Sequence, residues 1–179
     1  MINFLIHSFN LDISSDSMVW IIEVGYKKGV TDPVGFLTKK EIDDLGIHSV
    51  KEVRSISTYT ITGNIGEEEV RKIGEELLSD NQIQEFGYRG IGVSKGLGHD
   101  VHNGWLVEVG FKLGVMDAVG MSAAKAIEIL GVGEVKEVKT GNKFLIIGDI
   151  SEEDVKKICE RVLANSLIHK YRYSRIGGI

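Results

Sequence analysis

The chain has 179 residues, of which 42% are hydrophobic and 26% charged, and its formal net charge is -5 at pH 7. This composition is that of a globular protein, and the negative charge argues against a surface that follows nucleic-acid phosphates or a polybasic membrane patch. No segment approaches the roughly 18 apolar residues that a bilayer span needs, and no signal-peptide pattern opens the sequence. We therefore expect a cytoplasmic protein that binds neither nucleic acid nor membrane. A single cysteine, Cys159, excludes an internal disulfide and a thiolate metal site.

The sequence contains an internal duplication. Residues 20–88 align without a gap with residues 105–173, and about 30 of roughly 69 aligned positions are identical, against about 4 expected by chance. The predicted organisation is a leader (1–19), repeat 1 (20–88), a glycine-rich linker (89–104), repeat 2 (105–173) and a tail (174–179). The linker lacks periodicity, so we expect a flexible tether. The leader could form an extra strand or be disordered, and the sequence does not choose between these alternatives.

Each repeat opens with an alternating apolar pattern that predicts a strand beginning at Trp20 or Trp105. A helix follows, with Asp32 or Asp117 placed to cap its first turn, and Gly46 or Gly131 is predicted to end it in a left-handed conformation. The only proline of the chain, Pro33, falls at the first helical position, where a missing amide hydrogen costs nothing.

Two further strands are predicted next, over 49–56 and 58–64 in repeat 1. In repeat 2 the pair Gly141-Asn142 stands between them and is typical of a tight hairpin, so we expect the two strands to be antiparallel neighbours. A second helix starts at the capping-box pattern of Ser151 and Asp154, and a final strand completes the repeat. The order β-α-β-β-α-β predicts an α+β, ferredoxin-like fold.

A unit of about 70 residues buries a small fraction of its surface, so one repeat alone has a thin core. Two copies in one chain can remedy this by packing together as a homodimer would. We predict an intramolecular pseudo-dimer. A homo-oligomer of such pseudo-dimers is left open.

The candidate site residues all have a structural explanation. Asp32 and Asp117 recur in the context Gly-Val-x-Asp-x-Val-Gly, and a helix cap is favoured over catalysis because no second group for acid-base chemistry stands nearby. His99 and His102 are better explained by a solvated loop than by a metal site, since further ligands are missing. Cys159 lies on an apolar helix stripe and is predicted to be a small core residue. We therefore predict no catalytic residue and no metal ligand; the motif residues are Asp32, Pro33, Gly35, Asp117 and Gly120.

Aromatic residues recur at matched positions of the two repeats. For the tryptophans, packing in the core or between the copies is favoured over stacking on a ligand. The closing segments combine aromatics with arginine, a composition enriched at protein interfaces. The candidate interface residues are Trp20, Trp105, Phe86, Tyr88, Tyr171, Arg172 and Tyr173.

Several short motifs occur in the same order in both repeats. In repeat 1 they are Gly-Val-Thr-Asp32-Pro33-Val-Gly35, Val50-Lys-Glu-Val53-Arg54 and Ile83-Gln-Glu-Phe-Gly-Tyr88, and in repeat 2 Val138-Lys-Thr-Gly141-Asn-Lys-Phe144 and Tyr171-Arg172-Tyr173. The sequence resembles the PurS family, the small subunit of phosphoribosylformylglycinamidine synthase, over both repeats. It departs from the common single-unit pattern and is similar to a PurS dimer fused head to tail.

This resemblance implies a non-catalytic subunit acting in de novo purine biosynthesis. It implies PurL-type synthetase and PurQ-type glutaminase subunits as partners, with this chain bridging them so that ammonia passes from one to the other. It also implies that the complex uses ATP, Mg²⁺ and glutamine, with no cofactor bound by this chain. The alternative, by analogy of fold alone, is a regulatory module in which tandem ferredoxin-like repeats bind a small molecule.

Overall fold

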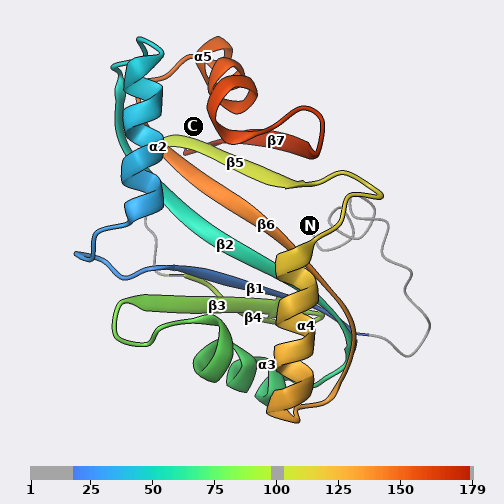
Figure 1. The fold of residues 1–179 in the computed structure, drawn as a ribbon. Helices are drawn as coiled ribbons and strands as arrows, with labels where there is room; N and C mark the ends of the chain where they lie inside the picture. The colour runs from blue at the N-terminus through green and yellow to red at the C-terminus, as the bar shows by residue number, and fades with distance from the viewer. Residues whose placement is uncertain (1–17, 98–102, 178–179) are drawn as a thin grey trace. The chain divides into compact units, whose positions relative to one another are not determined.

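The computed structural model describes residues 18–97 and 103–177. Repeat 1 folds in the order β1 (Met18–Tyr26), α2 (Pro33–Asp44), β2 (Val50–Asn64), α3 (Glu67–Ile73) and β3 (Gln84–Gly90). Repeat 2 follows the same order with β5 (Gly104–Phe111), α4 (Ala118–Leu130), β6 (Glu134–Gly148), α5 (Glu152–Ile158) and β7 (His169–Ile176). Single π-helical turns, η1 (Gly74–Leu78) and η2 (Cys159–Leu163), extend α3 and α5 (Figure 1).

The middle of each repeat is one long strand and not a hairpin. β2 and β6 each run for 15 residues without a turn. Gly141 and Asn142, the predicted turn, lie inside β6 and pair with Gly110 and Val109 of β5. A two-residue hairpin of the predicted type needs positive φ at its central residues, and Gly141 is not among the glycines with positive φ. The predicted hairpins are therefore wrong.

The described residues form two compact units, and each unit draws on both repeats. Unit 1 holds residues 18–24, 58–97 and 113–140, and unit 2 holds residues 25–57, 103–112 and 141–177. Each long middle strand thus contributes one half to each unit, and the first helix of each repeat lies in the unit that holds the other repeat's first strand. The repeats have exchanged their first helices, as in a domain-swapped dimer.

Within each unit the exchanged pieces complete a ferredoxin-like fold. The strands of unit 1 lie in the order β4-β3-β1-β2-β6, and those of unit 2 in the order β2-β6-β5-β7. Unit 1 therefore has the β-α-β-β-α-β arrangement formed by β1, α4, the first half of β6, the second half of β2, α3 and β3. The α+β fold of two ferredoxin-like units built as an intramolecular pseudo-dimer is confirmed, although the opened middle strand was not predicted.

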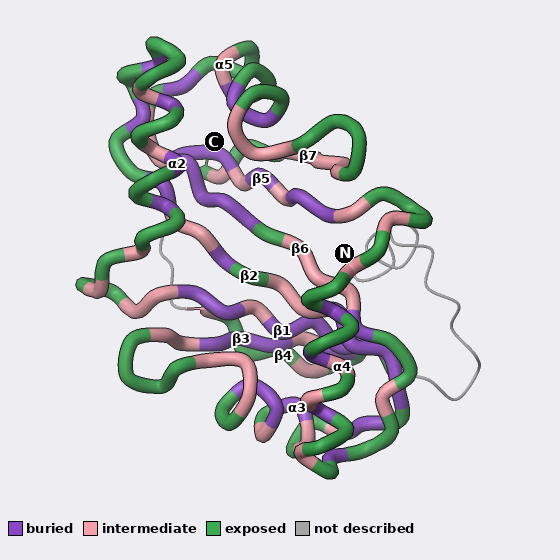
Figure 2. Tube along the Cα trace, viewed as in Figure 1, coloured by how far each residue is buried: buried purple, intermediate pink, exposed green. Residues whose placement is uncertain are grey.

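Each unit has its own hydrophobic core, and residues of both repeats meet in it. In unit 1, Trp20 and Ile22 of repeat 1 cluster with Ala123 and Ile127 of helix α4. In unit 2, Ile42 of helix α2 clusters with Trp105 and Val107 of repeat 2. Figure 2 shows the resulting burial along strands β1 and β5. Since the buried side chains of each core come from both repeats, neither repeat holds a complete core of its own. Burial of such side chains is the main favourable term in folding, so each repeat depends on the other for stability.

The predicted linker is partly ordered. Strand β4 (Val93–Lys95) folds back on β3, pairing Tyr88 with Lys95 and Gly90 with Val93. Gly92 has φ of 78°, which permits this tight turn. The expectation of a tether is therefore wrong for 93–95. The leader residues 1–17 and the predicted loop histidines, His99 and His102, lie outside the described residues.

Candidate functional site

Each repeat has a carboxylate that ties the start of its first helix to the middle strand of the same repeat. Asp32 is the N-cap of α2, and its carboxylate accepts hydrogen bonds from the backbone N–H of Gly35 at 2.8 Å and from the hydroxyl of Ser55 on β2 at 2.8 Å. Asp117 repeats the arrangement in unit 1, with Gly120 N–H at 2.7 Å and the Thr140 hydroxyl at 2.9 Å. The backbone N–H groups of Ser55 and Thr140 also donate to these carboxylates. Both oxygens are thus used in holding structure, which favours the cap interpretation.

Glycine at the third helical position lets the helix approach the strand closely. A Cβ atom on Gly35 would lie 2.2 Å from the carbonyl oxygen of Val53, and one on Gly120 would lie 2.4 Å from that of Val138. These distances are shorter than any normal contact, so a larger residue would push the helix away from the strand. Pro33 stands at the first helical position, and the same position in repeat 2 is Ala118.

We expect Asp32→Ala to lower the free energy of unfolding by about 2 kcal/mol, because it removes a helix cap and leaves the part-buried N–H of Ser55 without its acceptor. Urea denaturation followed by circular dichroism measures the change. Ser55→Ala is the matched control, since it removes only the hydroxyl contact and should cost about 1 kcal/mol or less. Equal losses in the two variants would contradict the importance of the cap.

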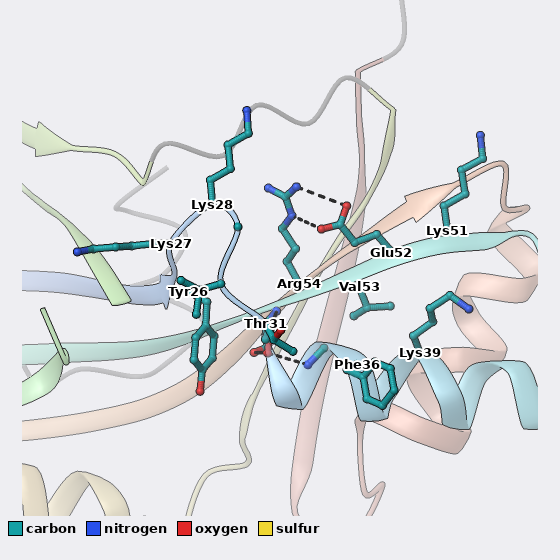
Figure 3. Close-up of a pocket in the computed structure, with 15 residues that line it drawn as sticks. Tyr26, Lys27, Lys28, Thr31, Phe36, Lys39, Lys51, Glu52, Val53 and Arg54 are labelled. Carbon is teal, nitrogen blue, oxygen red and sulfur yellow. Dashed lines mark hydrogen bonds and ion pairs between the residues drawn. The ribbon is translucent and has the colours of Figure 1, made fainter. Parts of the chain in front are cut away.

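A cavity of about 320 Å³ lies beside this capped turn in unit 2. Its walls come from the end of β1, the turn before α2, the first turns of α2 and the first half of β2. In Figure 3, Lys28, Lys51 and Arg54 extend in one direction, whereas Tyr26 points the opposite way. The cationic residues that line it are Lys27, Lys28, Lys39, Lys51 and Arg54, and the acidic ones are Asp32 and Glu52. The surroundings are therefore positive although the whole chain is negative.

The tryptophans predicted as interface residues are buried inside the units. Trp20 donates its indole N–H to the carbonyl of Ile65 at 3.0 Å, and Trp105 donates to that of Ile150 at 3.1 Å. Each ring also meets a tyrosine edge to face, Tyr88 at 6.2 Å and Tyr173 at 5.8 Å between centroids. Because each tryptophan is 5 to 6% exposed in a core shared by both repeats, it packs the repeats together and has little surface left for a ligand.

The closing strands differ in exposure between the repeats. Phe86 and Tyr88 are buried in unit 1, and the Tyr88 hydroxyl lies 2.7 Å from Glu67. Their counterparts Tyr171 and Tyr173 are half-buried on β7, and Arg172 between them forms an ion pair with Glu108. An interface with another protein at Tyr171, Arg172 and Tyr173 stays a prediction.

Cys159 is fully buried in the core of unit 2, as predicted. Burial raises the pKa of its thiol to about 12. Its counterpart in repeat 1 is Gly74, where a Cβ atom would lie 2.4 Å from the ring of Phe86. The half-buried Tyr171 stands at the corresponding place beside Cys159. The thiol therefore fills space that the aromatic ring occupies in repeat 1.

We expect the thiol of Cys159 to react with a disulfide reagent at pH 8 about a thousandfold more slowly in the folded protein than in guanidinium chloride, because its pKa of about 12 leaves almost no thiolate. The folded pKa lies above the unfolded value, so the folding stability that this proton contributes is complete below about pH 9 and falls as the pH rises toward 12. Absorbance of the released thiol and thermal melts from pH 7 to 11 measure the two effects. Fast labelling of the folded protein would contradict the burial.

The described residues contain no group of three or more histidine, cysteine, aspartate or glutamate side chains placed to hold a metal ion. Within those same residues, no helix is both long and apolar enough to cross a membrane. Among the described residues, the basic cavity and the exposed side chains of the two units are the features open to a ligand or a partner. Sequence reasoning missed the cavity. Its signal was the difference between the repeats at positions 28 and 39, where repeat 2 has Leu113 and Ala124.

Comparison with known proteins gives the family. The family model described as "Phosphoribosylformylglycinamidine (FGAM) synthase", PurS, matches the chain twice, over residues 20–91 and 105–176. The phosphoribosylformylglycinamidine synthase subunit PurS of Methanocaldococcus jannaschii is 37% identical over 70 residues, which are 36% of this chain and 84% of the relative.

The subunits of the same name from Archaeoglobus fulgidus and Bacillus subtilis are 38% and 34% identical, over 36% and 37% of this chain and 88% and 84% of theirs. Each relative thus corresponds to a single repeat. The two family matches together cover most of the chain, and each match corresponds to one of the two repeats. The chain belongs to the PurS family and is a tandem form of the PurS subunit of phosphoribosylformylglycinamidine synthase, an enzyme of purine biosynthesis.

Proposed function

We propose that this chain is a non-catalytic subunit that bridges PurL-type synthetase and PurQ-type glutaminase subunits and supports the transfer of ammonia between them. ATP, Mg²⁺ and glutamine are used by those other subunits. The observation that carries the proposal is that the two repeats keep one backbone but expose different chemistry. A symmetric homodimer offers the same surface twice, whereas two unlike partners need two unlike surfaces.

One such difference lies in the turn before the first helix. In repeat 2 this turn and the start of the helix expose four apolar side chains, each more than half accessible: Leu113 at 80%, Met116 at 75%, Val119 at 59% and Met121 at 63%. In repeat 1 the positions of Leu113 and Met116 hold the polar residues Lys28 and Thr31, whereas Val34 and Phe36 are apolar and exposed as in repeat 2. The difference in polarity therefore lies at Leu113 and Met116. Exposed apolar patches mark interaction sites, and methionine adapts its shape to a partner. We call the four residues of repeat 2 the apolar turn.

The backbone of this segment is the same in both repeats. Gly29 and Gly114 have φ of 85° and 80°, and Asp32 and Asp117 make equivalent caps. The side chains have therefore diverged on a constant scaffold. This pattern is expected where the two copies have adapted to different binding partners.

Reconstitution with the synthetase and the glutaminase tests the proposal. The purified chain alone should show no turnover, and adding it should raise glutamine-dependent product formation while leaving ammonia-dependent formation by the synthetase within about twofold, since the bridge acts on ammonia supply. Leu113→Glu/Met116→Glu should remove most of the glutamine-dependent gain, because two charges would be buried at the contact. Leu167→Glu is the matched control, as Leu167 is 81% exposed and lies outside the apolar turn.

Two results would overturn the proposal. One is glutamine-dependent synthesis that runs at full rate without this chain. The other is a Leu113→Glu/Met116→Glu chain that supports glutamine-dependent synthesis as well as Leu167→Glu does.

A further inference from the structure

The basic cavity of unit 2 is the feature that the bridging function leaves unexplained. All of its lining residues come from repeat 1, between Tyr26 and Ser55, and all belong to one compact unit. At about 320 Å³ it is at the small end of the range for ligand-binding cavities. Five cationic and two acidic side chains line it.

Both acidic side chains are already engaged. Asp32 accepts hydrogen bonds from Gly35 and Ser55, and Glu52 pairs with Arg54 at 2.6 Å. The helix start is therefore closed by its own cap and is not itself the anion site. Glu52 offsets the charge of Arg54, whereas Asp32 bonds only to neutral groups and keeps its negative charge in the wall.

The lysines keep more positive charge than these acids can compensate. Lys39 pairs with Asp43 at 2.6 Å, but Lys28 and Lys51 are exposed and have no ion pair within the part of the chain that the structure describes. Lys28 on the turn and Lys51 on β2 point in the same direction, and the paired Arg54 and Glu52 lie between them (Figure 3). Lysine and arginine grouped around a concave surface are suited to phosphate oxygens, because each N–H donates a charge-assisted hydrogen bond.

Repeat 2 provides an internal comparison. Its turn has the same φ at Gly114 and the same aspartate cap, yet Leu113 and Ala124 stand where repeat 1 has Lys28 and Lys39. The backbone therefore does not require lysine at either position. The other three cationic positions are basic in both repeats, since Lys112, Lys136 and Lys139 match Lys27, Lys51 and Arg54. Repeat 1 therefore adds two lysines to a set of three basic residues that both copies share.

We propose that this cavity binds a phosphorylated small molecule, with its phosphate held by the cationic side chains of the lining, Lys28 and Lys39 among them, and its remaining part against the turn and Phe36. Phe36 is 65% exposed and lines the same cavity, so it offers an aromatic face to a flat group such as a nucleobase. The ligand class is a phosphate monoester or a nucleotide. The site is independent of the apolar turn, which lies in unit 1.

Isothermal titration calorimetry of the full chain with inorganic phosphate, pyrophosphate, AMP and ADP at fixed ionic strength tests this. We expect one site per chain with a dissociation constant of about 0.1 mM or tighter for at least one probe. Tighter binding of AMP than of phosphate would assign the ligand as a nucleotide, and equal binding would assign the phosphate group alone. Absence of binding by every probe up to about 5 mM would overturn the proposal and leave an acidic protein segment as the partner of this face.

Variants that borrow residues from repeat 2 keep the test specific. Lys28→Leu/Lys39→Ala copies the residues that repeat 2 carries on the same backbone, so it should fold, and it should weaken binding at least about tenfold. Lys40→Ala removes a lysine of the same helix that does not line the cavity and should change the affinity by less than about twofold. Equal weakening by the double variant and by Lys40→Ala would contradict a built site.

The reciprocal variant Leu113→Lys/Ala124→Lys gives a second readout. It places the missing lysines on the matching turn of repeat 2, so the stoichiometry should rise from one ligand per chain to two. A stoichiometry that stays at one would contradict the assignment of binding to these lysines.

Discussion

Ile127→Ala is expected to destabilise the strands of repeat 1, although Ile127 belongs to repeat 2. Its side chain is fully buried in the core of unit 1 together with Trp20 and Ile22. Truncation of a buried isoleucine to alanine leaves a cavity and lowers the free energy of unfolding by about 3 kcal/mol. Hydrogen exchange measured by mass spectrometry should show lost protection in β1 and β3 and little change in β5 and β7.

The mirror variant exists in the same chain. Ile42 is the equivalent residue of repeat 1 and is fully buried in the core of unit 2, so Ile42→Ala should loosen β5 and β7 of repeat 2. Ile129→Ala is the matched control, because Ile129 lies on the same helix as Ile127 but is 78% exposed and should cost about 0.5 kcal/mol or less. If Ile127→Ala deprotected β5 and β7 instead, the exchange of helices would be wrong.

Much of the local structure could be predicted from the sequence. The caps at Asp32, Asp117 and Ser151 depend on contacts three residues apart, which a pattern of residue types reveals directly. Gly46 and Gly131 adopt the predicted left-handed conformation, with φ of 84° and 71°. The hydrogen bonds from Ser55 and Thr140 to the two aspartates, in contrast, join residues 23 positions apart, and no local pattern shows them.

The exchange of segments could not be predicted, for a physical reason. In a closed hairpin the two halves of the middle strand would pair with each other. In the structure a Cβ atom on Gly63 would touch Glu134 and Val135, and one on Gly148 would touch Ser49 and Val50. The second half of each middle strand therefore pairs with the first half of the other repeat's middle strand. The repeats are similar in sequence, so both pairings present the same alternation of inward and outward side chains. A hydrophobic pattern fixes which face is buried, but it does not choose between two such partners.

The cavity was missed for a related reason. Motifs shared by the two repeats do not include the positions at which the repeats differ. Lys28 and Leu113 are such a pair, and they occupy equivalent places in the turn before the helix. A charged residue in one repeat and an uncharged residue at the equivalent position of the other indicate that the two repeats differ in function at that place. The apolar turn and the basic cavity both arise from this comparison.

Repeat 1 expressed alone, as residues 18–97, is expected to be a homodimer that unfolds when it dissociates. A monomer would lack Ile127, Val132 and Val138, which complete the core of unit 1, and its own helix α2 would have no core to enter. A second copy restores both, because Ile42, Ile47 and Val53 are the matching residues of repeat 1 and are buried in the same way.

The relatives that match a single repeat over 84 to 88% of their length show that one repeat suffices as a chain. Light scattering after size exclusion should therefore give twice the monomer mass, and the melting temperature should rise with protein concentration, since association is linked to folding. Dissociation should also remove the helical circular dichroism signal, because helices this short are marginal without tertiary packing. The full tandem chain is the control, and its melting temperature should not depend on concentration. A folded monomer of repeat 1 at micromolar concentration would mean that the middle strand closes into the hairpin after all, and that the exchange in the tandem chain follows from its covalent link and not from the cores.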